Sequence, residues 1–383
     1  MRFLVVPGGT TSAVAGLLWP SAINCALRRA RPHCALGEQA RSQQARLISS
    51  GVRNVPLALL SSAAAGSSAS PGQECTSVAS AAVSDGASTN EGVRQLRELL
   101  DSAGGSAVVL TGAGISTDSG IPDYRGPKGS YSRGHKPLTH DQFLSSEDNR
   151  KRYWARSIFG WDSFSRARPN AGHAALAKLE SMGKISDIIT QNVDGLHQKA
   201  GSMNVVDLHG KNDMVECMSC GYRSGRNAYQ ADLARRNAPW LAKYSAELGV
   251  GRVEARDSER TGRGDRLRAD GDADLEPGAY LGDFIVPACP QCGGFVKPTV
   301  VFFGDNIPRH RVEETYRLVD ESRLLIAAGS SLQVYSAFRL VKRAADAGKQ
   351  VAVVNRGETR AERSGLDVLK VEAGVSSVFT QLL

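Results

Sequence analysis

The body of this chain alternates short apolar stretches with helical patterns, and that alternation limits its possible folds more than any other feature. The expected buried strands are aliphatic or β-branched, and each ends near Gly, Asn or Asp: Ala107–Leu110, Ile185–Ile189, Val205–Leu208, Val300–Phe303, Leu324–Ala328 and Val351–Val354. Helical patterns lie between several of them, at His173–Ser181, Arg311–Val319 and Ala337–Ala347. Such alternation predicts an α/β fold in which helices cover both faces of a parallel sheet.

Residues 1–85 have the composition of an organellar leader. They contain seven Arg, no Lys and three acidic residues, and so carry half of the net charge of +8. Arg-bearing, acid-poor, Ser-rich composition is typical of transit peptides, so we expect a disordered leader and a mitochondrial matrix location, with a plastid as the alternative. A secretory signal is less favoured because Pro20 interrupts the apolar stretch Ala13–Ile23. Ordered structure is expected to begin near Ser88, which has capping-box spacing to Glu91.

Composition disfavours several classes of protein. The 383 residues allow about two or three domains, and no stretch reaches 18 apolar residues, so we expect no membrane insertion. Seven Cys spread over a long chain argue against a small disulfide-stapled secreted protein. The body is only weakly basic, so we expect no specific nucleic-acid partner. The oligomeric state is open, with a monomer as the default.

Four Cys form two paired motifs, Cys217-x-x-Cys220 and Cys289-x-x-Cys292. Two such motifs can place four thiolates at the corners of a tetrahedron, the geometry zinc prefers, and they leave no open position for catalysis. We therefore predict one structural zinc ion per chain. The 68 residues between the motifs include a charged insertion, Gly251–Glu276, with six Arg and eight acidic residues. We expect this insertion to be solvated and mobile.

The segment Gly112-Ala113-Gly114-Ile115-Ser116 follows the first expected strand. Glycines there would let backbone N–H groups approach a pyrophosphate, although the same pattern fits a plain strand–helix turn. Hydride-transfer dehydrogenases need a third Gly where Thr117 stands and an acidic residue at a strand end about 20 residues on, which is missing. A plain dehydrogenase is therefore disfavoured.

Polar groups follow several of the later strands. Gln191-Asn192-Val193-Asp194 offers adjacent amide and carboxylate groups that can hold a ribose and a carboxamide, although Asn/Asp-rich turns are common. His209 ends the next strand and is a candidate general base, with a structural His as the alternative. Gly329-Ser330-Ser331 and Asn355-Arg356-Gly357 suit a second nucleotide half. Val301-Phe302-Phe303-Gly304 could pair with a peptide by β-augmentation, and it also fits a core strand.

Together these residues resemble the sirtuin family of NAD-dependent protein-lysine deacylases. The motifs occur in the family's order from about residue 90 onward: Gly112–Ser116, Gly120-Ile121-Pro122-Asp123-Tyr124-Arg125, Gln191–Asp194, His209-Gly210, both Cys pairs, Val301–Asp305 and Gly329–Ser331. Tyr124, the segment Arg152–Arg156 with Gly160-Trp161, and Gly329–Tyr335 resemble the class II, sirtuin-4-type branch, which is mitochondrial. Two features depart from the family: Gly126 replaces a commoner Ser, and the charged insertion is longer than expected.

The resemblance implies a Rossmann-like doubly wound domain with a smaller zinc-binding domain inserted. NAD and an acyl-lysine protein substrate would enter the cleft between the two domains from opposite sides. The expected division is a leader at 1–85 and a catalytic domain at 86–383. Within the catalytic domain we expect a large domain of 86–126, 170–212 and 295–383, a helical segment at 127–169, and a zinc module at 213–294 with its disordered insertion at about 250–276.

The resemblance also implies roles for single residues. His209 would be the general base on a ribose hydroxyl, Asn192 and Asp194 would fix the nicotinamide amide and its ribose, and Tyr124 would shield the reacting centre. The peptide substrate would contact Val301, Phe302, Phe303 and Gly304. The other expected NAD contacts are Gly112, Ala113, Gly114, Ser116, Thr117, Ile121, Pro122, Asp123, Arg125, Gln191, Val193, Gly329, Ser330, Ser331, Asn355, Arg356, Gly357 and Ala373. The products would be nicotinamide, free lysine and an acyl-ADP-ribose ester.

The sequence is compatible with two other functions. The same site could perform mono-ADP-ribosyltransfer, and a non-catalytic NAD-sensing protein is disfavoured by the joint presence of His209, Asn192 and Asp194. Sirtuins that prefer succinyl or malonyl groups use a Tyr and an Arg in the acyl pocket, and the spacing of Tyr131 and Arg133 matches that pattern poorly. We therefore expect a bulky or lipoyl-type acyl preference.

Overall fold

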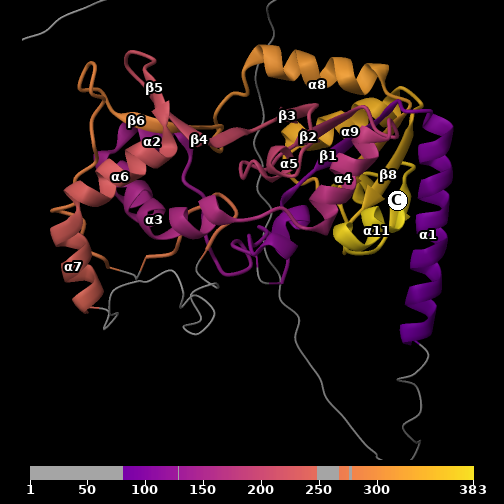
Figure 1. Cartoon of the computed structure of the whole chain (residues 1–383), viewed down its shortest axis with the longest axis horizontal. Coiled ribbons are helices and arrows are strands. Elements are labelled where there is room, and N and C mark those ends of the chain that lie inside the picture. The colour runs from indigo at the N-terminus through magenta and orange to yellow at the C-terminus, as the bar shows by residue number, and fades with distance from the viewer. Residues whose placement is uncertain (1–80, 128, 248–266, 276–277) are drawn as a thin grey trace, which may run out of the picture. The chain divides into compact units, whose positions relative to one another are not determined.

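Six parallel strands form the central sheet in the order β3-β2-β1-β7-β8-β9, and Figure 1 labels β1, β2, β3 and β8 of this sheet. Their bounds are β1 Ala107–Thr111, β2 Asp187–Thr190, β3 Val205–Asp207, β7 Leu324–Ala328, β8 Gln350–Val354 and β9 Leu369–Val371. The order reverses between β1 and β7, as in doubly wound folds, so the predicted parallel α/β sheet is confirmed. This computed structural model describes residues 81–127, 129–247, 267–275 and 278–383; most of the expected leader and the middle of the charged insertion lie outside the described residues.

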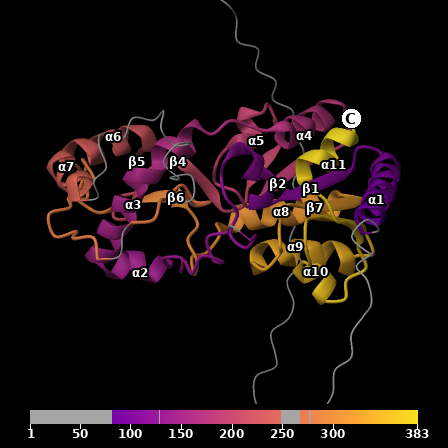
Figure 2. The ribbon, with the colours of Figure 1, turned by 90° about the horizontal axis from the view of Figure 1, so that it is seen from below.

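Helices cover both faces of this sheet (Figure 2). Val109 packs into one hydrophobic cluster, whereas Val108 and Leu110 pack into the other, because successive strand side chains point to opposite faces. One face is covered by α1 Ala81–Ala103, α4 Ala171–Ser181 and α11 Val375–Gln381, and the other by α8 Arg309–Glu321, α9 Tyr335–Asp346 and α10 Arg360–Arg363. The three helices predicted between strands are confirmed as α4, α8 and α9. The predicted helix start near Ser88 is wrong, because α1 already begins at Ala81.

A second, antiparallel sheet in the order β5-β4-β6 forms a small module. Phe143, Trp154 and Phe284 are almost fully buried in its aromatic-rich core. Its strands are β4 Gly210–Cys217, β5 Arg223–Gly225 and β6 Val296–Val300, and the neighbouring helices are α2 His140–Ser145, α3 Glu147–Arg166, α6 Arg226–Arg236 and α7 Ala238–Glu247 (Figure 1).

The strand expected at Val300–Phe303 is misplaced. The structure ends β6 at Val300 and pairs it antiparallel with β4, so this segment does not enter the parallel sheet. Only Val300 of the expected strand lies in β6, which begins at Val296, so the apolar run gave neither the bounds of the strand nor the sheet it joins. The boundary expected after residue 212 falls inside β4, and because β4 pairs with β6, both strands belong to the small module.

The C-terminal end of the charged insertion is packed, contrary to the prediction of a solvated loop. In the segment 267–275, Asp272 and Ala273 are buried, and the N–H of Ala273 donates to the carbonyl of Arg156 in α3 at 3.3 Å. Burial and then the nearby Asp270 raise the pKa of Asp272 to about 8, and the positive charge of Arg156 opposes this rise. Asp272 therefore lies near Arg156 of α3, and the residues next to Asp272 in the sequence do not predict this partner.

Two internal replacements would test this packing. Replacing residues 250–264 by a short Gly/Ser linker should leave stability nearly unchanged. Replacing residues 250–274 should lower the free energy of unfolding by roughly 3 kcal/mol or more, because buried apolar side chains are lost and a cavity remains against α3. Denaturant unfolding of both variants measures the difference, and equal stabilities would contradict a packed segment.

Candidate active site

The carboxyl ends of β1 and β7 meet where the strand order reverses, the place at which doubly wound sheets hold ligands. The N–H of Gly114 donates to the carbonyl of Gly329 at 2.8 Å, and that of Gly112 to the carbonyl of Ala328 at 3.0 Å. A Cβ on Gly114 would lie 2.8 Å from Gly329 Cα, and one on Gly112 2.7 Å from Ser330 Cβ, so both positions require Gly. These glycines thus serve the contact between two loops. Because these two N–H groups already bond to the carbonyls of Ala328 and Gly329, they are not free to make the predicted pyrophosphate contacts.

Ser116, in the short helix η1 Ala113–Ser119, links the loop after β1 to the loop after β2. Its hydroxyl donates to Asp194 Oδ2 at 2.7 Å, and Asn192 Nδ2 donates to Ser116 Oγ at 3.1 Å. Asp194 Oδ1 accepts the N–H of Leu196, the first residue of α5 Leu196–Lys199, at 2.9 Å. Burial raises the pKa of Asp194, and the hydrogen bonds from Leu196 and Ser116 oppose that rise. The structure therefore brings Asn192 and Asp194 together and holds Asp194 by bonds inside the protein.

His209 lies just beyond β3. Its Nδ1 is 3.1 Å from the carbonyl oxygen of Gln191, which can only accept, so we assign the ring proton to Nδ1 and the lone pair to Nε2. Nε2 is 2.9 Å from Ser336 Oγ. Burial lowers the pKa of His209 to about 4; the bond to Gln191 opposes this shift, and Arg311 and Arg339 add to it. The ring is neutral near pH 7, as a general base has to be.

The loop after η1 carries the predicted Asp123, Tyr124 and Arg125. Asp123 Oδ1 accepts the N–H of Gly126 at 2.9 Å, and a Cβ on Gly126 would lie 2.3 Å from Asp123 Oδ2. A Ser at this position would displace the Asp123 carboxylate, which is the end of a side chain, so the fold does not require Gly here. The rings of Tyr124 and Tyr131 lie 5.4 Å apart, and the Arg125 guanidinium lies 5.0 Å from the Tyr131 ring centroid.

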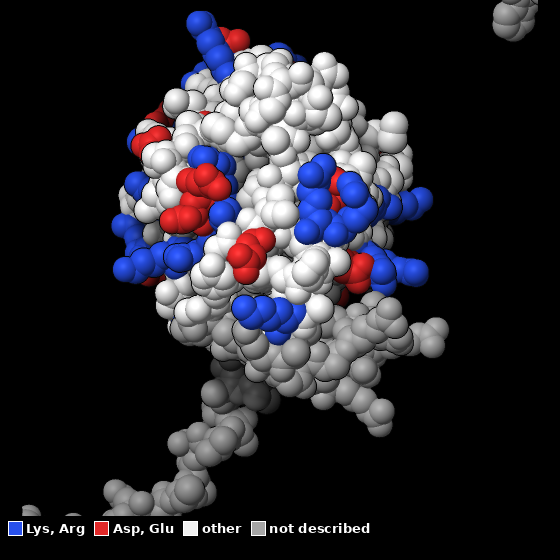
Figure 3. Space-filling model, turned by 90° about the vertical axis from the view of Figure 1, so that its left-hand side faces the viewer, with Lys and Arg blue, Asp and Glu red and all other residues white. Residues whose placement is uncertain are grey.

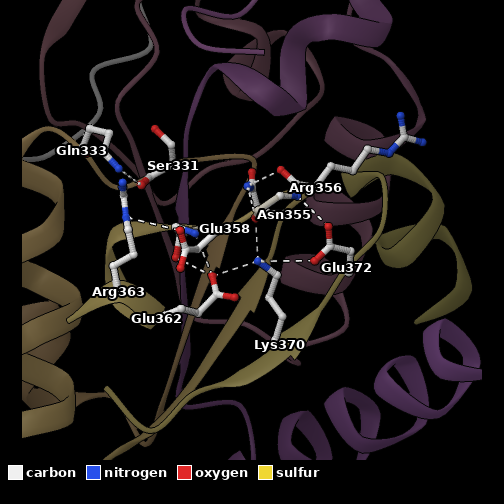
Figure 4. Close-up of polar contacts among 11 residues, drawn as sticks. Ser331, Gln333, Asn355, Arg356, Glu358, Glu362, Arg363, Lys370 and Glu372 are labelled. Atoms are coloured by element: carbon white, nitrogen blue, oxygen red, sulfur yellow. Dashed lines mark hydrogen bonds and ion pairs between the residues drawn. The ribbon is translucent and has the colours of Figure 1, made fainter. Parts of the chain in front are cut away.

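Asn355, Arg356 and Gly357 follow β8, and the N–H of Asn355 donates to the carbonyl of Val371 at the end of β9 at 3.2 Å; Figure 4 shows Asn355 beside Lys370 and Glu372. Asn355 Nδ2 donates to the carbonyl of Gly357 at 3.2 Å, and the N–H of Gly357 donates to Glu372 Oε1 at 2.8 Å. Lys370 Nζ also donates to the carbonyl of Gly357, at 2.7 Å. Arg356 extends away from this group (Figure 4). These bonds fix the loop, so a ligand at this end of the sheet would meet an already ordered backbone.

The predicted peptide-binding segment, Val301–Gly304, leaves the small sheet after β6. The N–H of Val301 donates to the carbonyl of His209 at 2.9 Å, and the carbonyl of Phe303 accepts the N–H of His140 at 2.9 Å. Phe303 also forms an isolated parallel bridge with Thr139. The segment is therefore bonded to the backbone of the candidate base at one end and to α2 at the other.

The four Cys converge, as the paired motifs predict. All four Sγ atoms lie within 4.8 Å of one another, with 3.5 Å between Cys217 and Cys292 and 3.7 Å between Cys220 and Cys289. Four thiolates at ordinary zinc distances stand about 3.8 Å apart, so the cluster fits a tetrahedral zinc ion. Cys217 and Cys289 are buried, which further fits a closed structural site.

The remaining predicted residues differ in exposure. Ile121 and Val193 are buried together in one hydrophobic cluster, so their side chains anchor the loops that carry them. Gln191 Nε2 donates to Ser330 Oγ at 2.9 Å, which joins the loops after β2 and β7. Ala113, Pro122, Ser331 and Ala373 are partly buried, and Thr117 is exposed.

Two residues of the site were missed from the sequence. Asn170 caps α4 and donates from Nδ2 to the carbonyl of Ile115 at 2.7 Å, which ties α4 to η1; an Asn just before a helical pattern is a readable capping signal. Ser336 contacts His209 although 127 positions separate them, so no local pattern marks it.

The face of the molecule drawn in Figure 3 carries both acidic and basic side chains. On the face of the small module, acidic side chains lie among basic ones (Figure 3). Among the helices of the described residues, none has the length and apolar character needed to cross a membrane.

The geometry defines a doubly wound α/β protein that has a His-containing polar site at its switch point and an attached four-Cys module. The Sir2 family matches residues 112–336. An NAD-dependent protein deacetylase of Xanthomonas campestris is 47% identical over 264 residues, which are 69% of this chain and 82% of that protein. An NAD-dependent protein deacylase of Batrachochytrium dendrobatidis is 43% identical over 283 residues, 73% of this chain and 89% of that protein.

Solved structures agree with this match. A structure described as "Structural Basis for the Mechanism and Regulation of Sir2 Enzymes" has a TM-score of 0.57 at 29% identity, and a Sir2–p53 peptide–NAD+ complex has 0.56 at 29%. Each alignment covers 76% of this chain and 96% of the solved one. The chain therefore belongs to the Sir2 family, and it is an enzyme.

Proposed function

We propose that this enzyme is an NAD-dependent protein-lysine deacylase. The observation that best supports this proposal is the state of His209, whose imidazole is neutral. Its Nδ1 is hydrogen-bonded to the carbonyl of Gln191, the residue before Asn192, so the candidate base lies beside the loops at the switch point. The relatives support the proposal, since they bear the names of NAD-dependent deacetylases and deacylases, and one solved structure is a complex with peptide and NAD+.

Each residue of the site would have its own role in the reaction. When bound, NAD supplies a nicotinamide–ribose bond that can be exchanged for a bond to the acyl oxygen. Asn192 and Asp194 would hold the nicotinamide end, with Ser116 bonded to both of them, and Asn355 with Arg356 would receive the adenosine end. With NAD bound, His209 Nε2 would accept the proton of a ribose hydroxyl and so make that oxygen nucleophilic towards the acyl carbon. One water molecule is consumed, and the products are nicotinamide, free lysine and an acyl-ADP-ribose ester.

The acyl-lysine peptide would lie along Val301–Gly304 as an added strand. This assignment rests on the direct bond between Val301 and the backbone of His209, since a peptide on this segment would pass close to the base. The cysteine cluster would hold one structural zinc ion, for which its spacing and donor set are suited.

For the acyl group we propose a bulky or lipoyl-type chain. Arg133 Nη2 donates to the carbonyl of Leu267 at 3.2 Å, so part of its guanidinium is already bonded within the protein, which disfavours a dedicated Tyr–Arg pocket for acidic acyl groups. Peptides carrying acetyl, succinyl, lipoyl or long-chain acyl-lysine, each incubated with NAD, should show the largest kcat/KM for the bulky chains. A preference for succinyl would contradict this assignment.

Mass spectrometry of the same reactions tests the reaction class. Deacylation removes the mass of the acyl group from the peptide, whereas mono-ADP-ribosyltransfer adds ADP-ribose to it. Gain of ADP-ribose without loss of the acyl group would replace the proposal with that alternative.

The Arg-bearing, acid-poor leader supports a mitochondrial location. A full-length protein with a C-terminal fluorescent tag should co-localise with a matrix marker, and removal of residues 1–80 should abolish this. Nuclear, cytosolic or plastid fluorescence of the full-length protein would contradict the proposal.

A further inference from the structure

The hydroxyl of Ser336 is hydrogen-bonded to Nε2 of His209, the atom that has to accept a proton when His209 acts as the base. Ser336 lies in the first turn of α9, and its Oγ is 2.9 Å from His209 Nε2. Because Nδ1 holds the proton that faces the carbonyl of Gln191, Nε2 can only accept, so the Ser336 hydroxyl donates to it. In the resting site, Ser336 thus makes the bond that a ribose hydroxyl makes during the reaction.

The surroundings of His209 oppose its protonated form. The charged groups that act on it are Arg311 from α8 and Arg339 from α9, and both disfavour a second positive charge. Arg311 Nη1 lies 3.5 Å from the carbonyl of Leu208, and Asp207 partly balances the charge of Arg311. The Nε of Arg339 is buried and has no hydrogen-bond partner among the described residues. An imidazolium formed here therefore needs an acceptor close to Nε2.

We propose that Ser336 is a positioning residue for the His209 base. Its hydroxyl donates to Nε2 in the resting enzyme and holds the ring in place. In the base step, the ribose hydroxyl would displace the Ser336 hydroxyl from Nε2. Its O–H bond would break, its proton would form an N–H bond at Nε2, and its oxygen would add to the acyl carbon as the π electron pair of that carbon moves to the lysine nitrogen. Ser336 then turns its hydroxyl and accepts the new Nε2–H, without losing its own proton. This role rests on the proposed deacylase function.

Ser336→Ala should lower the rate of deacylation by about ten- to a hundred-fold, the effect of losing one hydrogen bond to a group that becomes charged. Nicotinamide exchange precedes the base step, so it should stay within about three-fold of the wild type, as should KM for NAD. Ser336→Thr keeps the hydroxyl and should restore most of the rate. Ser181→Ala, at an exposed Ser at the end of α4, is the control for loss of a hydroxyl and should have no effect.

A second readout needs no cofactor. In ¹⁵N NMR of the cofactor-free protein, Nδ1 of His209 should appear protonated and Nε2 as a hydrogen-bonded acceptor, and Ser336→Ala should shift Nε2 alone towards a free acceptor. Wild-type deacylation by Ser336→Ala, an equal fall of exchange and deacylation, or no gain with Ser336→Thr would each overturn the role of Ser336. If the wild type removes no acyl group, the proposed function fails, and an unchanged Nε2 signal in Ser336→Ala would separately overturn the contact.

Discussion

Replacing His209 with Ala should lower deacylation by roughly 100- to 10,000-fold, the usual contribution of a positioned general base. The fold should persist, because the lost contacts are two hydrogen bonds, to Gln191 and Ser336, at the edge of the sheet. Nicotinamide exchange should fall much less, because the base acts after that step. Steady-state assays of both reactions on the same preparation measure the difference.

His310→Ala is the matched control for this variant. His310 is exposed on α8, so its loss should change neither reaction. Near-normal deacylation by His209→Ala would remove His209 from the mechanism. Equal losses of exchange and deacylation would mean that the substitution had damaged cofactor binding and not the base step.

Replacing Cys217 or Cys289 with Ser should release the metal and unfold the small module. Structural zinc binding is folding free energy, about 10 to 16 kcal/mol in small zinc domains, which is comparable with the whole stability of a protein domain. Both thiols lie in the aromatic core of the module, so the loss would reach the packing around Phe143 and Phe284. Metal analysis should fall from about one zinc per chain to nearly none, because the cluster is a single four-thiolate site.

Cys75→Ser is the matched control, because Cys75 precedes the catalytic domain in sequence and belongs to neither paired motif. It should keep its zinc and its unfolding midpoint. A wild-type protein that is fully folded without metal would contradict a structural zinc site, and so would a Cys217→Ser variant of unchanged stability.

Some elements could be read directly from the chain. The strands Ala107–Thr111 and Leu324–Ala328 were recognised because strands buried on both faces form continuous aliphatic runs. The Cys pairs were equally readable, because a four-thiolate site depends on residue type and close spacing within each pair. The strand ends carrying Asn192 and His209 were identified because a parallel sheet gathers such positions at one edge.

Contacts between segments that are far apart in the chain could not be predicted from the sequence. The charge of the segment 267–275 indicated solvent, yet Ala273 bonds to α3 and Asp272 is buried, because their partners lie far away in the sequence. The N–H groups of Gly112 and Gly114 were expected to be free for a phosphate, but they bond to the neighbouring β7 loop.

The sequence by itself determined the α/β class, the candidate base and the two cysteine pairs, because these depend on periodicity, residue chemistry and short spacing, and its motifs resembled those of the family to which the chain belongs. Only the tertiary structure decided which sheet β6 joins, which nitrogen of His209 carries the lone pair, and that Ser336 covers it. These properties depend on distances between segments that are far apart in the chain, and no local pattern encodes such distances.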